Sequence, residues 1–294
     1  MSLAALAPSG SAVAAEPLRM APSSPWHLDY AEDSCRLMRT FGSGADSGMV
    51  YFERYGPGDP FNLVVAAKAL RSVDEAFTLQ VQFGDQEEVQ EPDFFVGEFG
   101  DFGPALIFSS MSIRRPGSFG LKGKQLEQYF EAREKDPLPP IGAERERAVS
   151  WLSISRGKRH YVIFDLGSIA QPFAAMRSCT DNLLKQWGID VARHATLSRE
   201  PKPVNSPGTW VTANDYPYKM LRAGQRGIVH FRMIVDETGK PESCHIQQST
   251  RPKEFDDVVC KRLMERARFE PALDAEGLPL RSYYRNSVKF DVIS

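Results

Sequence analysis

The sequence predicts an α+β protein of two domains: a β-rich N-terminal domain closed by a C-terminal helix, and a smaller domain in which one helix packs on an antiparallel three-stranded sheet. Three observations support this. The length of 294 residues suits about two domains. Short β-forming runs dominate the first half, and the last 80 or so residues read as strand, strand, helix and strand. The predicted segments are a lead 1–25, a β-rich domain 26–188, a linker 189–213 and a second domain 214–294.

The first 15 residues resemble the end of a secretory signal. They are small and Ala-rich, and both Ala12-Val13-Ala14 and Val13-Ala14-Ala15 fit a small-x-small cleavage site. Pro8-Ser9-Gly10 interrupts the apolar run, and neither Lys nor Arg precedes Arg19. We therefore expect a truncated secretory signal and a periplasmic protein. The alternative is a disordered tail of small residues.

Short β-forming runs make up most of residues 26–165. Residues 77–83 alternate apolar and polar side chains over seven positions, which indicates a half-buried strand. Tyr161–Phe164 is a continuous apolar run that is typical of a central strand. Residues 49–55, 61–65, 105–108 and 151–154 are further expected strands.

The clearest helix of the first half covers residues 168–187. Its apolar side chains recur at spacings of three and four, Ser168 can cap its start, and Gly188 lies where a helix commonly ends. A second helical pattern, within the charged segment 123–147, stops at Asp136-Pro137. Its mixed charges predict a solvated surface.

The chain has four cysteines, Cys35, Cys179, Cys244 and Cys260, and an even number fits disulfides in an exported protein. Four cysteines allow three pairings. We expect Cys35–Cys179 and Cys244–Cys260, because each pair then stays within one predicted domain. The alternative is four buried thiols in a cytosolic protein.

Composition and motifs argue against several functions. A net charge of −2 and a pI near 6.3 give no basic footprint for nucleic acid, and no run of about 18 apolar residues predicts a membrane span. The sequence has no P-loop, no G-x-G-x-x-G and no G-x-S-x-G, and its five histidines lack metal-ligand spacing. We therefore expect no cofactor, no metal site and no catalytic residues.

Residues from about 211 to 292 have an ordered set of turns and strands that resembles the C-terminal domain of the TonB family. The matching features are listed in chain order: Tyr216-Pro217, Gly224 to Gly227, Val235-Asp236, Gly239, the segment 268–272, Gly277 and Val288-Lys289-Phe290. Each feature alone is weak, but the ordered set is fairly specific. The resemblance covers about 80 residues and does not extend to the first domain.

This resemblance implies a periplasmic protein that binds a TonB box-like peptide of an outer-membrane transporter. The peptide would add a strand to an open sheet edge. The candidate edge is the last strand, 281–290, whose side chains pointing away from the core are Arg281, Tyr283, Arg285, Ser287 and Lys289. A monomer and a strand-paired dimer are both compatible with such an edge.

Two departures from the family limit what the resemblance implies. The sequence has neither a long Pro-rich spacer nor an apolar anchor, and it has an additional β-rich domain. It therefore supports fold and peptide binding more than energy transduction. An alternative is an envelope enzyme with a catalytic first domain and a TonB-like docking module. A pocket in residues 26–188 with two or more convergent ionisable groups would favour that alternative.

Overall fold

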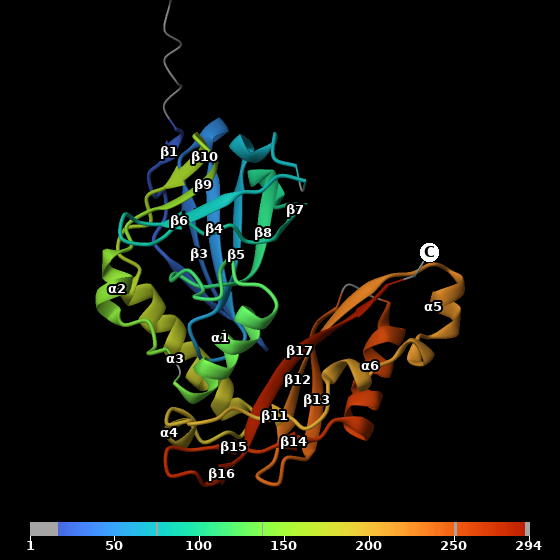
Figure 1. The fold of residues 1–294 in the computed structure, drawn as a ribbon. Coiled ribbons are helices and arrows are strands. Elements are labelled where there is room, and N and C mark those ends of the chain that lie inside the picture. Colours follow the sequence, from blue (N-terminus) through green and yellow to red (C-terminus); the bar gives the residue numbers. More distant parts are fainter. Residues whose placement is uncertain (1–16, 75, 137, 250–251, 292–294) are drawn as a thin grey trace, which may run out of the picture. The chain divides into compact units, whose positions relative to one another are not determined.

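The computed structural model describes residues 17–74, 76–136, 138–249 and 252–291 (Figure 1). The expected secretory signal lies outside these residues. Contacts within the chain divide it into two compact units, residues 1–180 and 181–294, with the division inside a helix. Within the described residues, no helix is both long and apolar enough to cross a membrane. The structure confirms the predicted α+β class.

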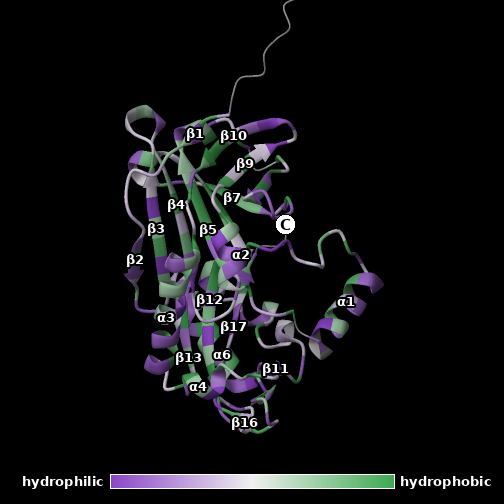
Figure 2. Ribbon diagram, turned by 90° about the vertical axis from the view of Figure 1, so that its left-hand side faces the viewer, coloured by the Kyte–Doolittle hydropathy of each residue, from purple (hydrophilic) through white to green (hydrophobic). Residues whose placement is uncertain are grey.

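Unit 1 contains a six-stranded sheet in which every neighbouring pair is antiparallel. In sheet order its strands are β2 (His27–Tyr30), β3 (Cys35–Phe41), β4 (Gly48–Arg54), β5 (Phe61–Ala67), β8 (Pro104–Met111) and β7 (Phe94–Glu98). The central strands are the most apolar, as their colour in Figure 2 shows, and β4 and β5 bury most of their residues. Strands β2, β3 and β7 were not predicted, because their sequences mix charged and apolar residues without strict alternation.

A second, four-stranded sheet has the order β1 (Arg19–Met20), β10 (Arg159–Phe164), β9 (Leu152–Arg156) and β6 (Gln80–Phe83). Strand β1 pairs in parallel with β10, and Met20 is only 2% exposed. The prediction of a flexible lead up to residue 25 is therefore wrong for residues 19–20. The apolar side chain of Met20 is buried in the core, and no local sequence pattern predicts this burial.

Aromatic side chains join the two sheets to helix α3 (Ala170–Gln186). The rings of Phe52 and Phe61 lie 5.2 and 5.8 Å from that of Phe173 on α3, and Phe61 also contacts Phe83 of the second sheet at 6.0 Å. All four rings are almost fully buried. Edge-to-face rings add specific geometry to the hydrophobic effect, so the expected helix closes the β-rich core through Phe173.

The charged segment 123–147 folds as two helices, α1 (Lys124–Lys135) and α2 (Ala143–Ala148). The prediction of a solvated surface is wrong for α2. Glu146 is 1% exposed and binds Arg177 of α3 through both carboxylate oxygens. Arg145 likewise binds both oxygens of the buried Glu87, at 2.5 and 2.6 Å. Buried carboxylates require such partners.

Unit 2 is built on a three-stranded antiparallel sheet of order β13 (Pro241–Ser249), β12 (Gly227–Val235) and β17 (Ser282–Phe290), as predicted. Helix α6 (Lys253–Arg266) contributes Phe255, Val259 and Leu263 to the core on one face of this sheet. Helix α5 (Tyr218–Arg222) precedes β12. Short paired strands surround the sheet: β11 (Lys202–Pro203) with β14 (Phe269–Glu270), and β15 (Ala272–Leu273) with β16 (Pro279–Leu280).

The predicted linker 189–213 is an ordered part of unit 2. It contains α4 (Val191–His194) and β11, and Trp210 is 1% exposed within the core under α6. The linker prediction is therefore wrong. Its prolines suggested an unattached segment, whereas they lie in or beside short elements that pair with residues 268–273.

The remaining turns are 3-10 helices at 44–46, 68–70, 100–102, 207–209 and 213–215.

The two disulfides have the expected pairing. Cys35 of β3 is bonded to Cys179 of α3, and Cys244 of β13 is bonded to Cys260 of α6. Each bond lies within one unit and joins a strand to a helix of the same core. Covalent links of this kind matter most in a core as small as that of unit 2.

We predict that the double variant Cys244→Ser/Cys260→Ser is less stable than the native chain by about 3 kcal/mol, because the bond closes a loop in the unfolded chain whose ends are 16 residues apart. Chemical denaturation of both proteins under oxidising conditions measures the difference. Equal stabilities would show that α6 packs on β13 without help from the bond.

Gly239 and Gly277 provide a matched pair for a second prediction. Both have positive φ, but an added Cβ at Gly239 would lie 1.8 Å from the carbonyl oxygen of Phe269, whereas none of the atoms described lies within 4 Å of one at Gly277. Gly277→Ala should therefore cost only about 1 kcal/mol of strain. We expect a substantially larger loss of thermal stability for Gly239→Ala, and similar losses for the two variants would contradict this view of the turn.

Candidate functional site

Strand β17 forms one edge of the sheet in unit 2. It pairs with β12 without interruption, from Gly227 opposite Phe290 to Val235 opposite Ser282, and no other strand among the described residues pairs with it. The opposite edge, β13, has two irregularities in its register with β12. Bulges bend an edge and weaken it as a template for further strands. The regular edge is therefore β17.

The outward side of β17 has backbone groups that can bond to an added strand. The Ser287 amide donates to the side-chain oxygen of its neighbour Asn286 at 2.8 Å, so this amide turns away from β12. Residues in an antiparallel strand alternate in the direction of their backbone groups. Arg285 and Lys289 therefore share the outward direction of Ser287.

The structure divides the five predicted edge residues into two groups. Arg285, Ser287 and Lys289 are exposed, and Lys289 pairs with Asp291 at 3.1 Å. Arg281 precedes the strand and binds Glu242 and the Trp187 carbonyl, each at 2.6 Å. It is thus committed to contacts within unit 2.

Tyr283 also points away from the core under α6, but other side chains cover it. Its ring lies 5.2 Å from that of Trp187 and stacks on His194 at 5.5 Å. Burial raises the pKa of the Tyr283 hydroxyl to about 12 and lowers the pKa of His194 to about 4. Along this strand, only the second half, residues 285–289, therefore has exposed outward side chains.

A groove of about 280 Å³ lies beside this second half of β17, on the face that also carries α6. One wall is formed by residues 286–289 of β17, and the other by residues 207–211, with Phe231 and Leu263 also lining it. The groove thus has a mixed lining, apolar at Trp210, Val211 and Val288 and polar at Asn286 and Ser287, and it lies next to outward backbone donors and acceptors. Its second wall comes from the segment that sequence reasoning treated as a linker.

Trp210 holds this second wall in place. Its ring packs on Phe269 and Tyr284, at 5.3 and 5.7 Å, and its indole nitrogen donates to Asn205 at 2.8 Å. Arg266 of α6 donates to the Trp210 carbonyl at 3.0 Å. These contacts fix the loop from both its side chain and its backbone.

Asp215 lies shortly after the groove wall in the sequence. It links this part of the chain to α6 through polar contacts, as Trp210 does through its carbonyl. Its carboxylate accepts hydrogen bonds from Arg266, at 2.6 and 3.0 Å, and pairs with Arg262 at 2.7 Å. The backbone amide and hydroxyl of Thr212 also donate to it. The Arg266 hydrogen bonds, despite opposing desolvation, hold the pKa of Asp215 well below its usual range. The groove wall is therefore tied to α6 by charge-assisted bonds.

Sequence reasoning missed this wall, although two signals were present. Thr212 and Asp215 have the spacing of a capping box, and the structure shows both of its hydrogen bonds. A tryptophan followed by a valine in an otherwise polar segment also suggests burial against a distant partner. Neither signal says which surface receives the segment.

The half-buried imidazole of His194 leads to a pH prediction. Its folded-state pKa, about 4, lies below the ordinary 6.5, so the unfolded chain binds the proton more readily. Stability should therefore fall as the pH drops from 6.5 towards 4, by on the order of 2 kcal/mol for this partly exposed ring. His194→Phe keeps an aromatic ring against Tyr283 and should reduce the fall, as denaturant unfolding at pH 7, 5.5 and 4.5 would measure. The exposed His160→Phe is the control, and equal pH profiles for all three proteins would oppose this assignment.

Comparison with known proteins agrees with the fold predicted for the C-terminal part of the chain. Residues 212–292 match the family model described as Gram-negative bacterial TonB protein C-terminal. The search of curated proteins gives no match to the chain. The matched segment contains β12, β13, α6 and β17 and omits residues 1–211, and therefore residues 207–211 of the groove wall. Residues 212–292 thus form a domain of the TonB C-terminal family, a periplasmic family of Gram-negative bacteria.

Proposed function

We propose that the protein is a periplasmic adaptor that binds an extended peptide of an outer-membrane transporter along β17. The observation that carries this proposal is the coincidence of an uninterrupted edge strand with a partly apolar groove beside its second half. The backbone of such an edge supplies affinity, and the groove supplies selectivity. In the family that residues 212–292 match, this binding serves energy-coupled transport across the outer membrane.

The geometry suggests how a peptide would be held. The outward amide of Ser287 would exchange its bond to Asn286 for one to a peptide carbonyl. Alternate peptide side chains would then point to the groove face and to the opposite face. Those on the groove face would contact Val288 and the 207–211 wall, so an aliphatic or aromatic residue is expected at that position of the peptide.

The side chains of Arg285 and Lys289 alternate with those of Asn286 and Val288 along the strand and are exposed, although Lys289 also borders the groove. Peptide side chains on their side of the strand would meet two cationic groups. We therefore expect a carboxylate there to strengthen binding modestly, since exposed ion pairs contribute about 0–1 kcal/mol. The expected peptide thus alternates apolar residues with polar or acidic ones.

The alternative of an envelope enzyme receives one supporting observation. A cavity of about 430 Å³ in unit 1 is lined by Asp59, Arg114, Arg115 and Arg133, which meets the pocket criterion stated above. Its described lining residues include serines and one carboxylate, Asp59, but no His, Lys, Cys or Glu. Asp59 accepts the Ile141 amide at 3.0 and 3.1 Å and lies 3.8 Å from Arg114, so its carboxylate is already engaged. Guanidinium groups stay protonated and do not act as general bases. The cavity therefore favours binding over catalysis, and the adaptor remains the better-supported function.

The test compares Ser287→Pro with Ser287→Ala. Both variants remove the hydroxyl, but only proline removes the outward amide, and an edge position tolerates proline because no bond to β12 is lost. Isotope-labelled full-length protein should show shifts at residues 285–289 with N-terminal peptides of outer-membrane transporters. We expect Ser287→Ala to bind like the native chain and Ser287→Pro to bind at least tenfold more weakly.

A control on the ligand side separates strand addition from other contacts. Two versions of the same peptide, N-methylated at the odd or at the even residues, keep the side chains, but each loses the backbone donors of one edge, so strand addition should fail with one of the two. Unchanged binding of both methylated peptides, or of Ser287→Pro, would exclude pairing along β17. The absence of any shift with all transporter peptides would leave residues 212–292 with the family fold alone.

A further inference from the structure

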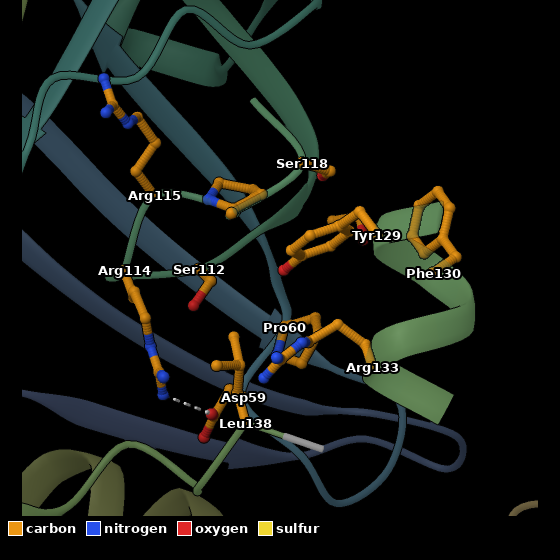
Figure 3. Close-up of a pocket in the computed structure, with 13 residues that line it drawn as sticks. Asp59, Pro60, Ser112, Arg114, Arg115, Ser118, Tyr129, Phe130, Arg133 and Leu138 are labelled. Atoms are coloured by element: carbon orange, nitrogen blue, oxygen red, sulfur yellow. Dashed lines mark ion pairs between the residues drawn. The ribbon is translucent and has the colours of Figure 1, made fainter. Parts of the chain in front are cut away.

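We infer that the cavity of unit 1 is a binding site for a small carboxylate with an apolar body. The cavity, of about 430 Å³, lies between α1, the loop 112–118 and residues 59–60 (Figure 3). This volume is in the range of small-molecule sites, which combine apolar walls with a few polar groups. All of its lining residues belong to unit 1.

Arg133 is the group that would hold the carboxylate. Figure 3 shows its guanidinium directed from α1 towards Pro60, into the space that the lining residues enclose. Its Nε is buried and has no hydrogen-bond acceptor among the described residues. Its ion-pair partner Asp136 is largely exposed. The distance of 3.6 Å between the two side chains is too long for a hydrogen bond. The guanidinium fork therefore has donors to spare for a planar carboxylate.

The other two arginines of the cavity are already engaged. Arg114 donates to the Pro139 carbonyl at 2.7 Å and lies 3.8 Å from Asp59. Arg115 pairs with Glu88 at 2.6 Å and points away from α1 in Figure 3. These contacts shape the cavity, while Arg133 remains the cation that faces its interior.

Further groups around Arg133 suit the same ligand. The hydroxyl of Tyr129 points into the cavity beside Ser112 and can donate a hydrogen bond to an anion (Figure 3). Tyr129 packs closely on Gly117, where an added Cβ would lie 2.7 Å from the hydroxyl oxygen. This contact keeps the phenol between α1 and the loop.

The apolar part of the ligand has its own surface. Pro60 and Pro116 line the cavity, and Phe130 and Leu138 stand at its rim with 57% and 46% of their surface exposed. Large apolar side chains exposed together around a cation mark a ligand site more than a solvated face. A carboxylate at Arg133 would place its hydrocarbon portion against these side chains.

Calorimetric titration of the full-length protein with octanoate and with 1-octanol tests the inference. Octanoate should bind clearly more tightly than octanol, which has the same chain length without the charge. Arg133→Gln should weaken octanoate binding at least tenfold, and Leu138→Ser should weaken it several-fold. Arg71→Gln, which replaces an exposed arginine outside the cavity, is the matched control and should bind like the native chain.

A second titration separates the two sources of such a carboxylate. The peptide acetyl-Ala-Ala-Leu with a free C-terminus is compared with its C-terminal amide. Binding of the acid but not the amide, lost in Arg133→Gln, would support the site and assign it to peptide ends, whereas binding of octanoate alone would support it and assign it to fatty acids. If neither carboxylate binds better than its uncharged counterpart, or if Arg133→Gln binds as the native chain does, the inference is wrong. Because the cavity and β17 share no residue, this result does not depend on the peptide-binding proposal.

Discussion

A three-stranded sheet has two faces and two edges, and a single helix can cover only one face. This constraint organises unit 2. Helix α6 covers the face formed by Val229, Phe231 and Met233. The other face would leave Ile234 and Tyr283 in water, but Trp187 and His194 pack against Tyr283, and the guanidinium of Arg232 lies 4.0 Å from the Trp187 ring. The family domain is thus completed by residues that precede it in the chain.

The same constraint explains why the open edge is confined to half of one strand. The beginning of β17 is occupied, because Arg281 and Tyr283 hold the segment at Trp187 and His194. The other edge is bulged at two places and is linked to α6 through Cys244. What remains is residues 285–289, and the 207–211 segment gives these residues a neighbouring groove. Completing the fold therefore also defines the place where a partner can add a strand.

Much of this architecture could be predicted from the sequence, and the failures share one cause. Strand β12 and helix α6 follow from periodicity, because each buries one regular stripe. Residues 189–213 and β1 do not, since their burial depends on distant partners such as Phe269 and Phe164. The edge strand lies within the family pattern and was predictable from it. The groove wall lies before that pattern and packs on distant residues, so it was not predictable. The cavity at Arg133 combines residues from 59 to 138, a spread that no local pattern reveals.

An open, regular edge can also pair with a second copy of the chain, and the two uses compete. Exposed Arg285 and Lys289 lie on β17, and antiparallel pairing of two such strands would bring like charges together across the pair. Repulsion of this kind opposes pairing of two copies along β17, whereas the acidic side chains of the proposed peptide would meet opposite charges. Asn286 acts in the same direction, because its side chain already satisfies the outward amide of Ser287 in the unbound protein. The unbound edge is thereby stabilised, while a peptide that offers both backbone bonds and an apolar side chain for the groove can still displace this local contact.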